Sequence, residues 1–574
     1  MNDHDLSWSV GALVPQLIIE EKTANEIEVY RSGRGKSNIH QSARNLSQNV
    51  SDDYGNRFLV ELIQNAHDAH PVGTSDGQIA VVFAPDECDF GSLYVANRGN
   101  GFSEKNFRAL TNIALSSKPV NESIGNKGLG FRSVLQICQW PEIYSVGEQG
   151  ARGNFDGYCF RFANKSDLTR FIEGPEADVL AEEILETMPC WYLPVYVADR
   201  PGIVGRFAEE KFASVVRLPL DSEKARELVF EQFDALLERE HPLHLFLDRI
   251  SCIRLEREPG KAQLLERKIT ERWPLSPNLK VERVAIGADD YLVGLYDLDP
   301  ENFRRTLDLS VARKEVPESW RYWQGTAQVS IAVRLGASPE SGLTYCFLPL
   351  GSEGKAPFAG YINANFYTKM DRRAVNDGVG LNKYFIETAA RLSCILIDFL
   401  IKENLPEAPG AVVDLLCWNY PYSAVVKAKL GKRSGGLVEQ KILPTQQQSG
   451  GVRWSSPKEA VIWDAQEISC FSAETVELKS NLVYGMRVAL VDQAASHCCS
   501  VSLVGMGTPS LKTIPASSSA RRSIPRMRRH DFSASWTSLN ASPRKVLRET
   551  QFFVRVVRWR TVANVDSIGL VVRR

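Results

Sequence analysis

The sequence lacks the features that mark secreted or disulfide-linked proteins. No CxxC pair occurs among its eleven cysteines, and the nearest cluster is His497-Cys498-Cys499. Adjacent cysteines are poorly spaced to ligate one ion together, so we expect no metal site there. Scattered cysteines in a chain of 574 residues fit a reducing compartment better than a disulfide framework. The N-terminus also has no basic segment followed by an apolar core, so we expect no secretory signal and a cytoplasmic protein.

Long apolar runs are missing as well. The longest, residues 390–401, is about twelve residues and contains charged side chains. It is too short to cross a bilayer, so it predicts a buried helix and no membrane partner. We find no internal repeat at the periods of solenoid proteins.

The chain as a whole has no dominant net charge, but its two parts differ strongly in charge. The formal net charge is -1, but residues 481–574 hold 15 Lys+Arg against 4 Asp+Glu, while residues 1–480 hold 53 against 65. The 481–574 tail is rich in Ser and Arg, which predicts an irregular, disordered segment able to bind phosphates, including those of nucleic acid. Its abrupt change of composition equally fits out-of-frame sequence after a truncation, in which case the chain is a fragment of a longer protein.

The order of predicted elements indicates an α+β protein. We expect an N-terminal helical segment over 1–50, a first α+β domain over 51–205 and a second over 206–405, then a small, poorly defined region over 406–480 before the tail. Within the first domain, residues 51–53 are candidate caps for a helix that follows, and residues 78–83 and 92–96 alternate like strands.

Three motifs follow one another between residues 58 and 133. The first is helix-like and carries Glu61, Asn65 and Asp68; the second is a turn after a strand, Asn97-Arg98-Gly99-Asn100-Gly101; the third is a loop with Gly125, Lys127, Gly128 and Gly130 that leads into a predicted helix over 131–138. Each alone is a weak signal. Together, in this order, they indicate a nucleotide site.

Glu61, Asn65 and Asp68 are spaced i, i+4 and i+7, so a helix places them on one face. The apolar residues of the segment form the opposite, buried face; they are Leu59, Leu62, Ile63 and Ala66. An ordinary amphipathic helix would show the same pattern. Magnesium accepts an amide oxygen such as that of Asn65 alongside water and phosphate, and Glu61 could take a proton from water attacking a phosphate.

The two glycine motifs fit the rest of a nucleotide. Gly99 and Gly101 would let the backbone pass close under a flat base. The third loop would offer phosphates its free N–H groups at the start of a helix. A glycine loop by itself is often only a turn.

In this order the motifs resemble the GHKL ATPases, which comprise gyrase B subunits, ninety-kilodalton heat-shock chaperones, histidine kinases and MutL. The segments 58–69, Ser117-Lys118 and 124–133 are most similar to the bacterial sacsin-like branch. The resemblance covers roughly residues 20 to 400. It implies a GHKL-type (Bergerat) sandwich with helices over one face of a mixed sheet, followed by a transducer-like α+β domain.

The resemblance also implies a role for each matching residue. Glu61 would be the hydrolytic base, Asn65 the magnesium ligand and Asp68 a supporting acid. Around ATP the resemblance implies contacts to the adenine from Asn97, Gly99 and Gly101, and to the phosphates from Ser117, Lys118, Gly125, Lys127, Gly128, Gly130 and Arg132. A basic residue of a second domain, here Lys369, Arg372 or Arg373, would reach the γ-phosphate, although such a run is more often only a solvated loop.

One position departs from the family. Most GHKL members have an aspartate where this chain has Asn97, and that carboxylate accepts the adenine amino proton. Asn97 can accept through its amide oxygen, but its NH2 group could face a guanine oxygen instead. His67 lies off the Glu61 face and is expected to be structural or solvent-facing.

Two functions follow as hypotheses. The first is an ATP-hydrolysing, magnesium-dependent switch of chaperone-like or remodelling type, in which nucleotide drives lid closure and domain docking toward a protein client. The second is a nucleotide-gated binding module with little turnover, in a bacterial defence or DNA-processing complex, that touches nucleic acid through the tail. No phospho-acceptor helix of a histidine kinase is visible, and the sequence leaves dimerisation open.

Overall fold

The computed structural model describes two compact units of the chain. The residues that it describes are 3–34, 40–42, 44, 57–112, 130–147, 153–237, 241–336, 338–351, 353–369, 373–446, 452–457, 460–461, 481–483, 553–560 and 566–573. The first unit comprises residues up to 334 together with 341–356 and 361–389, and the second comprises 335–340, 357–360 and 390–574. Each unit is described by itself.

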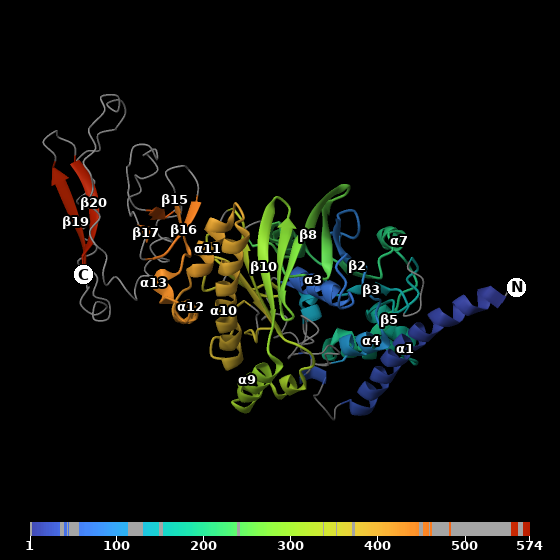
Figure 1. Cartoon of the computed structure of the whole chain (residues 1–574). Helices are drawn as coiled ribbons and strands as arrows, with labels where there is room; N and C mark the ends of the chain where they lie inside the picture. Colours follow the sequence, from blue (N-terminus) through green and yellow to red (C-terminus); the bar gives the residue numbers. More distant parts are fainter. Residues whose placement is uncertain are drawn as a thin grey trace. The chain divides into compact units, whose positions relative to one another are not determined.

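A 14-stranded sheet forms the body of the first unit (Figure 1). In sheet order its strands are β13 (Leu348–Pro349), β12 (Leu343–Cys346), β14 (Tyr361–Ala364), β11 (Gln328–Arg334), β10 (Asp289–Asp297), β9 (Leu279–Ile286), β8 (Lys261–Ser276), β7 (Ile250–Glu258), β1 (Gly77–Ala84), β2 (Ser92–Asn97), β6 (Ser214–Pro219), β3 (Glu142–Ser145), β4 (Phe160–Phe162) and β5 (Pro194–Tyr196).

The sheet is mixed. The pairs β1–β7 and β12–β14 are parallel, and the other neighbouring pairs are antiparallel. Strand β8 joins two halves, because its first residues pair with β7 and the remainder pairs with β9. The prediction of an α+β fold with a mixed sheet is confirmed.

Helices and short 3-10 turns surround this sheet. They are α1 (Asp3–Gly33), α3 (Phe58–Asp68), α4 (Glu104–Leu110), η1 (Gly130–Gln136), α5 (Lys165–Phe171), α6 (Ala177–Thr187), η2 (Cys190–Tyr192), α7 (Gly202–Glu209), α8 (Glu223–Leu236), α9 (Pro300–Ala312), η3 (Glu318–Tyr322) and the first part of α10 (Gly380–Glu403). Helix α1 lies within the N-terminal helical segment predicted over 1–50.

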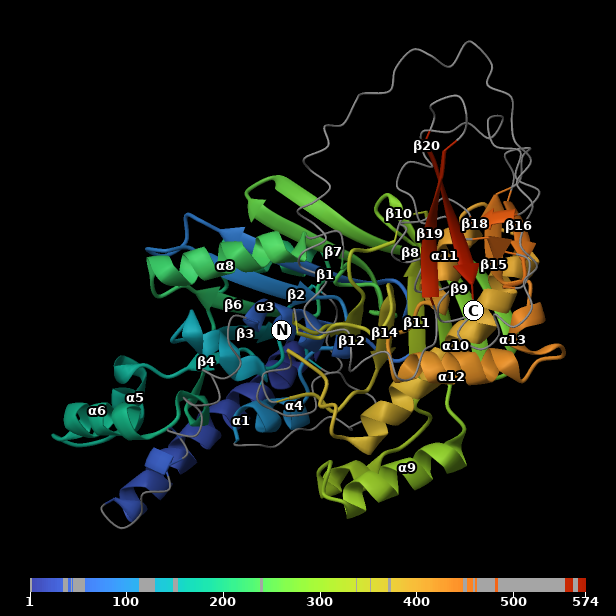
Figure 2. The ribbon, with the colours of Figure 1, turned by 90° about the vertical axis from the view of Figure 1, so that its left-hand side faces the viewer.

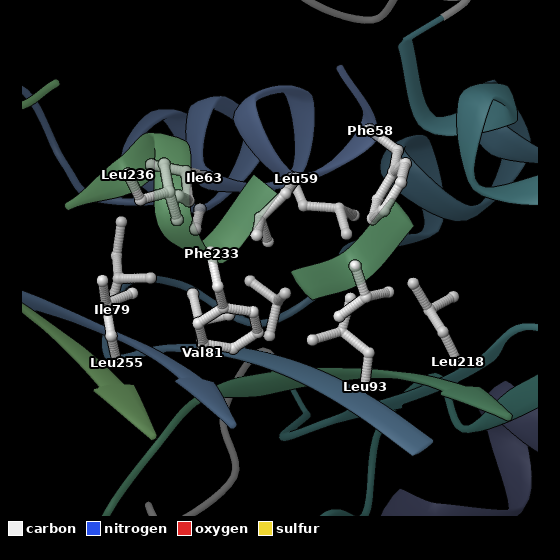
Figure 3. Close-up of a cluster of buried hydrophobic side chains, with 14 of the residues drawn as sticks. Phe58, Leu59, Ile63, Ile79, Val81, Leu93, Leu218, Phe233, Leu236 and Leu255 are labelled. Atoms are coloured by element: carbon white, nitrogen blue, oxygen red, sulfur yellow. The ribbon is translucent and has the colours of Figure 1, made fainter. Parts of the chain in front are cut away.

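Strand alternation decides which helices cover which face of the sheet. Ile79, Val81 and Phe83 of β1 point to one face, where they pack with α3, η1 and α8. The even-numbered Ala80 and Val82 belong to the opposite face, where α7 packs. Figure 2 shows α8 lying across the strands, and Figure 3 shows side chains of α3 and α8 meeting those of the sheet. Helix α3 is therefore fixed on the sheet by its apolar side.

The sheet continues across the boundary predicted at 205/206. Both residues lie inside helix α7, and the next strand, β6, pairs with β2 on one side and β3 on the other. Backbone hydrogen bonds thus join the segments that the sequence assigns to the first and second domains. Local patterns give the strands but not their partners, which is why this continuity is not visible in the sequence.

The second unit contains the end of α10, then α11 (Ala408–Leu416), α12 (Tyr422–Gly431), α13 (Gly436–Glu439), a small sheet in the order β16 (Val452–Ser455), β15 (Leu443–Gln446), β18 (Asn481–Val483), β17 (Ala460–Val461), and the antiparallel pair β19 (Phe553–Arg560) and β20 (Asp566–Arg573). The apolar run at 390–401 lies in α10, as predicted, and its Leu396, Ile397 and Leu400 are 0% exposed. Most of the 481–574 tail lies outside the described residues.

No helix in the described part of the chain is both long enough and apolar enough to cross a membrane.

Candidate functional site

Helix α3 carries the first motif and is held down by its apolar face. Leu59 and Ile63 are 0% exposed and pack against the sheet together with Leu62 and Ala66 (Figure 3). The predicted buried face is confirmed. The predicted caps at 51–53 are wrong, because the helix begins at Phe58 and its N-cap is Arg57, which makes no side-chain cap. Arg57 instead donates from Nη2 to the carbonyl oxygen of Pro349 at 2.8 Å.

The three polar residues of the motif lie along this fixed helix. Glu61 is 3% exposed, Asn65 is partly exposed, and the side chain of Asp68 is 2% exposed. Their spacing of four and three residues places them on neighbouring turns of one face. The acid near the first turn and the amide one turn later are therefore held by a helix whose position the core determines.

The glycine turn that forms the second motif is joined directly to the end of α3. The backbone N–H of Asn100 donates to the carbonyl oxygen of Ala69 at 2.7 Å. A Cβ atom on Gly99 would lie 2.5 Å from that same carbonyl, and one on Gly101 would lie 2.4 Å from the carbonyl oxygen of Val146. Both positions thus require glycine because backbone passes close to backbone. Two motifs about thirty residues apart in the sequence meet in space.

Asn97 closes β2 beside this turn, and both ends of its side-chain amide are engaged. Its Oδ1 accepts from the N–H of Gly99 at 3.0 Å, and its Nδ2 donates to Ser214 Oγ at 2.6 Å. A backbone N–H can only donate, so the oxygen must face Gly99 and the nitrogen must face Ser214. The chain therefore presents this amide, which is 7% exposed, in one orientation.

His67 is structural, not solvent-facing. It is 1% exposed, and its Nδ1 and Nε2 lie 3.4 Å from Asp68 Oδ1 and 3.2 Å from Asp248 Oδ1. Burial alone would lower the pKa of His67, but its hydrogen bonds to the two carboxylates outweigh this and raise it. His67 thereby ties the end of the motif helix to the segment that precedes β7.

The loop that forms the third motif is only partly described. Ser117, Lys118, Gly125, Lys127 and Gly128 lie outside the described residues. Gly130 begins η1, a 3-10 segment of seven residues where the sequence predicts an α-helix. Both Ile137 and Cys138 donate to the carbonyl oxygen of Val134. Val134, Ile137 and Cys138 are buried in the same core cluster as the apolar face of α3.

Arg132 follows the loop and is 5% exposed. Its guanidinium lies over the ring of Trp191, 4.4 Å from the centroid, and donates to the carbonyl oxygen of Asn112 at 2.8 Å. Burial lowers the pKa of Arg132. The side chain thus joins Asn112, the last described residue before the loop, to Trp191.

The basic residues proposed to reach the γ-phosphate lie on another segment of the first unit. Lys369 Nζ is 3.7 Å from Glu353 Oε2, and both side chains are more than half exposed. The side chain of Arg373 is close to Gly351, where a Cβ atom would lie 3.1 Å from its Cβ and Cγ. Arg372 lies outside the described residues.

Three residues important to this arrangement are not singled out by the sequence. They are Ser214, which holds Asn97; Ser145, whose Oγ accepts from the N–H of Phe102 at 2.7 Å; and Asp248, the partner of His67. Each sits far along the chain from the residue that it contacts. A serine or aspartate at a strand end carries no local signal of such a role, so only the sheet pairing identifies them.

A magnesium ion fits the donor set at this site only together with a phosphate ligand. No group of three or more His, Cys, Asp or Glu side chains that could hold a metal occurs within the described ranges. Asn65 offers one amide oxygen from a rigid helix. The remaining positions around a hard, octahedral cation would be filled by phosphate and water oxygens, as magnesium prefers.

No family model matches the chain. A stretch of 202 residues, 34% of the chain, is 25% identical to Protein NO VEIN of Arabidopsis thaliana, and it covers 6% of that protein. The chain therefore matches a small part of a much longer protein, and neither result assigns it to a family.

Proposed function

We propose that the chain binds ATP with magnesium through the 58–133 motifs, in a GHKL-type (Bergerat) site, and hydrolyses it. The observation that carries the proposal is the junction between the first two motifs. The 2.7 Å bond from Asn100 to Ala69 sets the end of the Glu61 helix against the Asn97 turn. The proposed general base and the amide proposed to contact the adenine therefore lie on two elements that are hydrogen-bonded to each other.

In this proposal each polar residue acts on a different part of the nucleotide. The adenine lies against the turn, where Asn97 offers one acceptor and one donor in a fixed orientation. Asn65 would hold a magnesium ion that enters with the nucleotide, by offering it an amide oxygen. Glu61 orients water toward the γ-phosphate and accepts its proton, a role that needs positioning above all. The 117–130 loop and Lys369 or Arg373 supply the remaining phosphate contacts.

In this proposal nucleotide binding changes the conformation of the first unit, because the site is built on a sheet that continues through that unit. Strands β1 and β7 pair side by side, and β8 continues from β7 into the second half of the sheet. A movement of α3 on closure around ATP would therefore be transmitted through the sheet to strands β8 to β14, with no separate linker. A remodelling or chaperone-like switch acting on a protein client is the function that this arrangement serves best.

The test is a set of variants assayed for binding and turnover. Glu61→Gln keeps the size and removes the charge of the proposed base, so it should bind Mg-ATP within about threefold of the wild type while turnover falls at least 100-fold. Glu104→Ala, on the exposed helix α4, is the control and should change neither. Steady turnover in Glu61→Gln and in Glu61→Ala would rule out hydrolysis by this residue.

Binding itself is tested separately with Asn65→Ala. Loss of the proposed magnesium ligand should weaken the binding of ATP more in the presence of magnesium than in its absence. Equal loss in both conditions would mean that Asn65 is structural. Failure of the wild-type chain to bind ATP in either condition would overturn the proposal as a whole.

A second candidate, a nucleotide-gated module with little turnover that binds nucleic acid, rests on the charge of the tail. Residues 481–574 carry 15 basic against 4 acidic side chains. Binding to DNA should then weaken steeply with salt, and replacing the five arginines between residues 521 and 529 by serine in the full chain should reduce that salt dependence. Unchanged salt dependence would remove this candidate.

A further inference from the structure

The described residues between 347 and 354, here called the connecting turn, follow strand β12 and contact the start of helix α3. Arg57 Nη2, at the N-cap of α3, donates to the carbonyl oxygen of Pro349 at 2.8 Å, although 292 positions separate the two residues in the sequence. Leu348 is 3% exposed and lies in the core cluster that contains the apolar face of α3. The connecting turn is therefore bound to the beginning of the helix that carries the first motif.

The backbone of Phe347 determines the shape of the connecting turn. Strands β12 and β13 pair through Cys346 and Leu348, so the chain reverses its direction at Phe347 alone. The φ of Phe347 is +64°, in the left-handed region that a bulky side chain adopts only at a steric cost. Its N–H donates to Asn363 Oδ1 at 2.6 Å, and its side chain packs against the core cluster that contains the apolar face of α3. Strained backbone persists where the surrounding structure holds it, and it is concentrated at functional sites.

The far end of the connecting turn contacts two basic residues, Lys369 and Arg373. A Cβ atom on Gly351 would lie 3.1 Å from Cβ and Cγ of Arg373, so the side chain of Arg373 lies against the backbone of the turn. Lys369 Nζ is 3.7 Å from Glu353 Oε2. The N–H of Lys369 also donates to the carbonyl oxygen of Ala374 at 3.1 Å, which links the two parts of the basic segment. The same turn thus contacts α3 at one end and the basic segment at the other.

We propose that the connecting turn positions Lys369 and Arg373 relative to Glu61, with Arg57 and Phe347 as the positioning residues. The inference rests on the proposed ATP function, in which Glu61 and one of the two cations act on the same γ-phosphate. These groups then have to keep a fixed separation, because a misplacement of about 1 Å can cost about 100-fold in rate. A single turn that contacts both elements provides this separation. Neither positioning residue contacts the nucleotide in this proposal.

The first test measures hydrogen exchange in the full chain without nucleotide. Arg57→Ala removes the bond to Pro349, so the amide of Lys369 should exchange at least tenfold faster while the amides of β1 and β2 keep their rates. Arg57→Lys keeps a donor and should stay within threefold of the wild type. Phe347→Gly adopts the positive φ freely and removes only the packed ring, so it should accelerate exchange at Lys369 at least threefold. Unchanged exchange there in either Arg57→Ala or Phe347→Gly would overturn the proposal.

Gln232 provides a matched control, because it holds the same helix start from a different element. It lies on α8, and its Oε1 accepts from the N–H of Leu59 at 2.9 Å. Gln232→Ala should therefore lower the free energy of unfolding without accelerating exchange at Lys369. Equal acceleration in Gln232→Ala and in Arg57→Ala would mean that any loosening of α3 reaches Lys369, and it would overturn a specific role for the connecting turn.

The second test is the steady-state turnover of Mg-ATP. Arg57→Ala should lower kcat at least tenfold and leave KM within threefold of the wild type, because the nucleotide contacts stay and only the geometry of the reacting groups changes. Arg57→Lys should keep kcat within threefold. Normal turnover in Arg57→Ala, or a raised KM with unchanged kcat, would retain the proposed ATP function and overturn the positioning role.

Combined variants show whether Arg57 acts through the two cations. Lys369→Ala together with Arg373→Ala removes the groups that Arg57 positions, so adding Arg57→Ala should lower kcat less than threefold further. A further tenfold fall would mean that Arg57 acts independently of them, and it would overturn the proposal. A wild-type chain that neither binds nor hydrolyses ATP would remove the proposed function. The exchange rates measured without nucleotide would then still decide whether the connecting turn couples α3 to Lys369.

Discussion

Asn97 and Ser214 are joined across adjacent strands by a hydrogen bond of 2.6 Å from Nδ2 to Oγ. The N–H of Gly99 fixes the other end of the amide by donating to Oδ1 at 3.0 Å. In the proposed ATP site, the second lone pair on Oδ1 and the second N–H on Nδ2 would contact the base. Such an amide is complementary to the donor-acceptor edge of adenine and equally to the acceptor-donor edge of guanine, if the base shifts.

Asn97→Asp should convert this site into one that discriminates between the two bases. Gly99 N–H and the Ser214 hydroxyl can both donate to a carboxylate, so the fold tolerates the change. A carboxylate only accepts, so it keeps the contact to the adenine amino group and repels the guanine O6. We expect the ratio of GTP to ATP Kd to rise at least tenfold in calorimetric titrations with magnesium. Asn100→Asp, an exposed neighbour in the same turn, should leave the ratio unchanged.

Gly99→Ala should break the junction between the turn and α3. The added Cβ would lie 2.5 Å from the carbonyl carbon and oxygen of Ala69, and backbone cannot move aside cheaply. We expect about 1–3 kcal/mol less stability in urea unfolding and a loss of ATP affinity. Gly205→Ala is the matched control, because no atom lies within 4 Å of its Cβ and α7 is a helix. That change should be neutral or stabilise by up to about 1 kcal/mol.

The parts of the site that depend on local pattern are predictable from the sequence. The apolar face of α3 follows from the 3.6-residue period, and β1 and β2 follow from alternation; all three elements form where these patterns predict. The need for glycine at 99 and 101 is also visible, although its cause is close packing against Ala69 and Val146.

The parts that depend on long-range pairing are not predictable in this way. Ser214 contacts a residue 117 positions away and Asp248 one 181 positions away, and neither lies in a recognisable motif. The same reason applies to the sheet that crosses residue 205, since strand partners are set by tertiary packing. The start of α3 is a further example. The acids at 52 and 53 suggest that the helix begins there, but it begins at Phe58, whose side chain is buried in the core.

Buried histidines should make stability depend on acid pH. Burial lowers the pKa of both His70 and His244 to about 4. Between pH 4 and about 6.5 the unfolded chain therefore binds more protons than the folded chain at these groups, so stability falls as pH falls through this window and levels off below it. The slope for each is at most about 1.4 kcal/mol per pH unit. The pKa of His67 is raised, so its contribution to stability is lost as pH rises above about 6.5.

The effect of histidine protonation on stability can be isolated with substitutions that keep the existing hydrogen bonds. His70→Asn can retain a donor to the carbonyl of Ala66, and His244→Gln can retain one to Glu266. Each should flatten the dependence of the free energy of unfolding on pH between 4 and 6.5, measured by urea titration. A slope that stays unchanged in both variants would assign the acid sensitivity to carboxylates instead.

Glu315 should be the residue that holds the start of α10. Its Oε2 accepts from the N–H of Gly380 at 2.8 Å and from Ser310 Oγ at 2.9 Å, while Ser310 Oγ accepts from the N–H of Leu381 at 3.1 Å. These bonds pair the first free N–H groups of the helix, and the bond from Gly380 lowers the pKa of Glu315. Glu315→Ala should therefore cost about 1–2 kcal/mol locally.

The loss should appear as faster hydrogen exchange of the amides at Gly380 and Leu381, by roughly tenfold, with little change in the sheet. Glu315→Gln keeps an acceptor and should lose less than half of this protection. Glu318→Ala, an exposed acid of η3, should lose none. Because the folded pKa of Glu315 is depressed, its contribution is present above the ordinary glutamate pKa and disappears as pH falls below it, so the wild-type and Glu315→Ala exchange rates should converge in acid. Rates that differ equally at every pH would mean that the carboxyl group acts by packing and not by its charge.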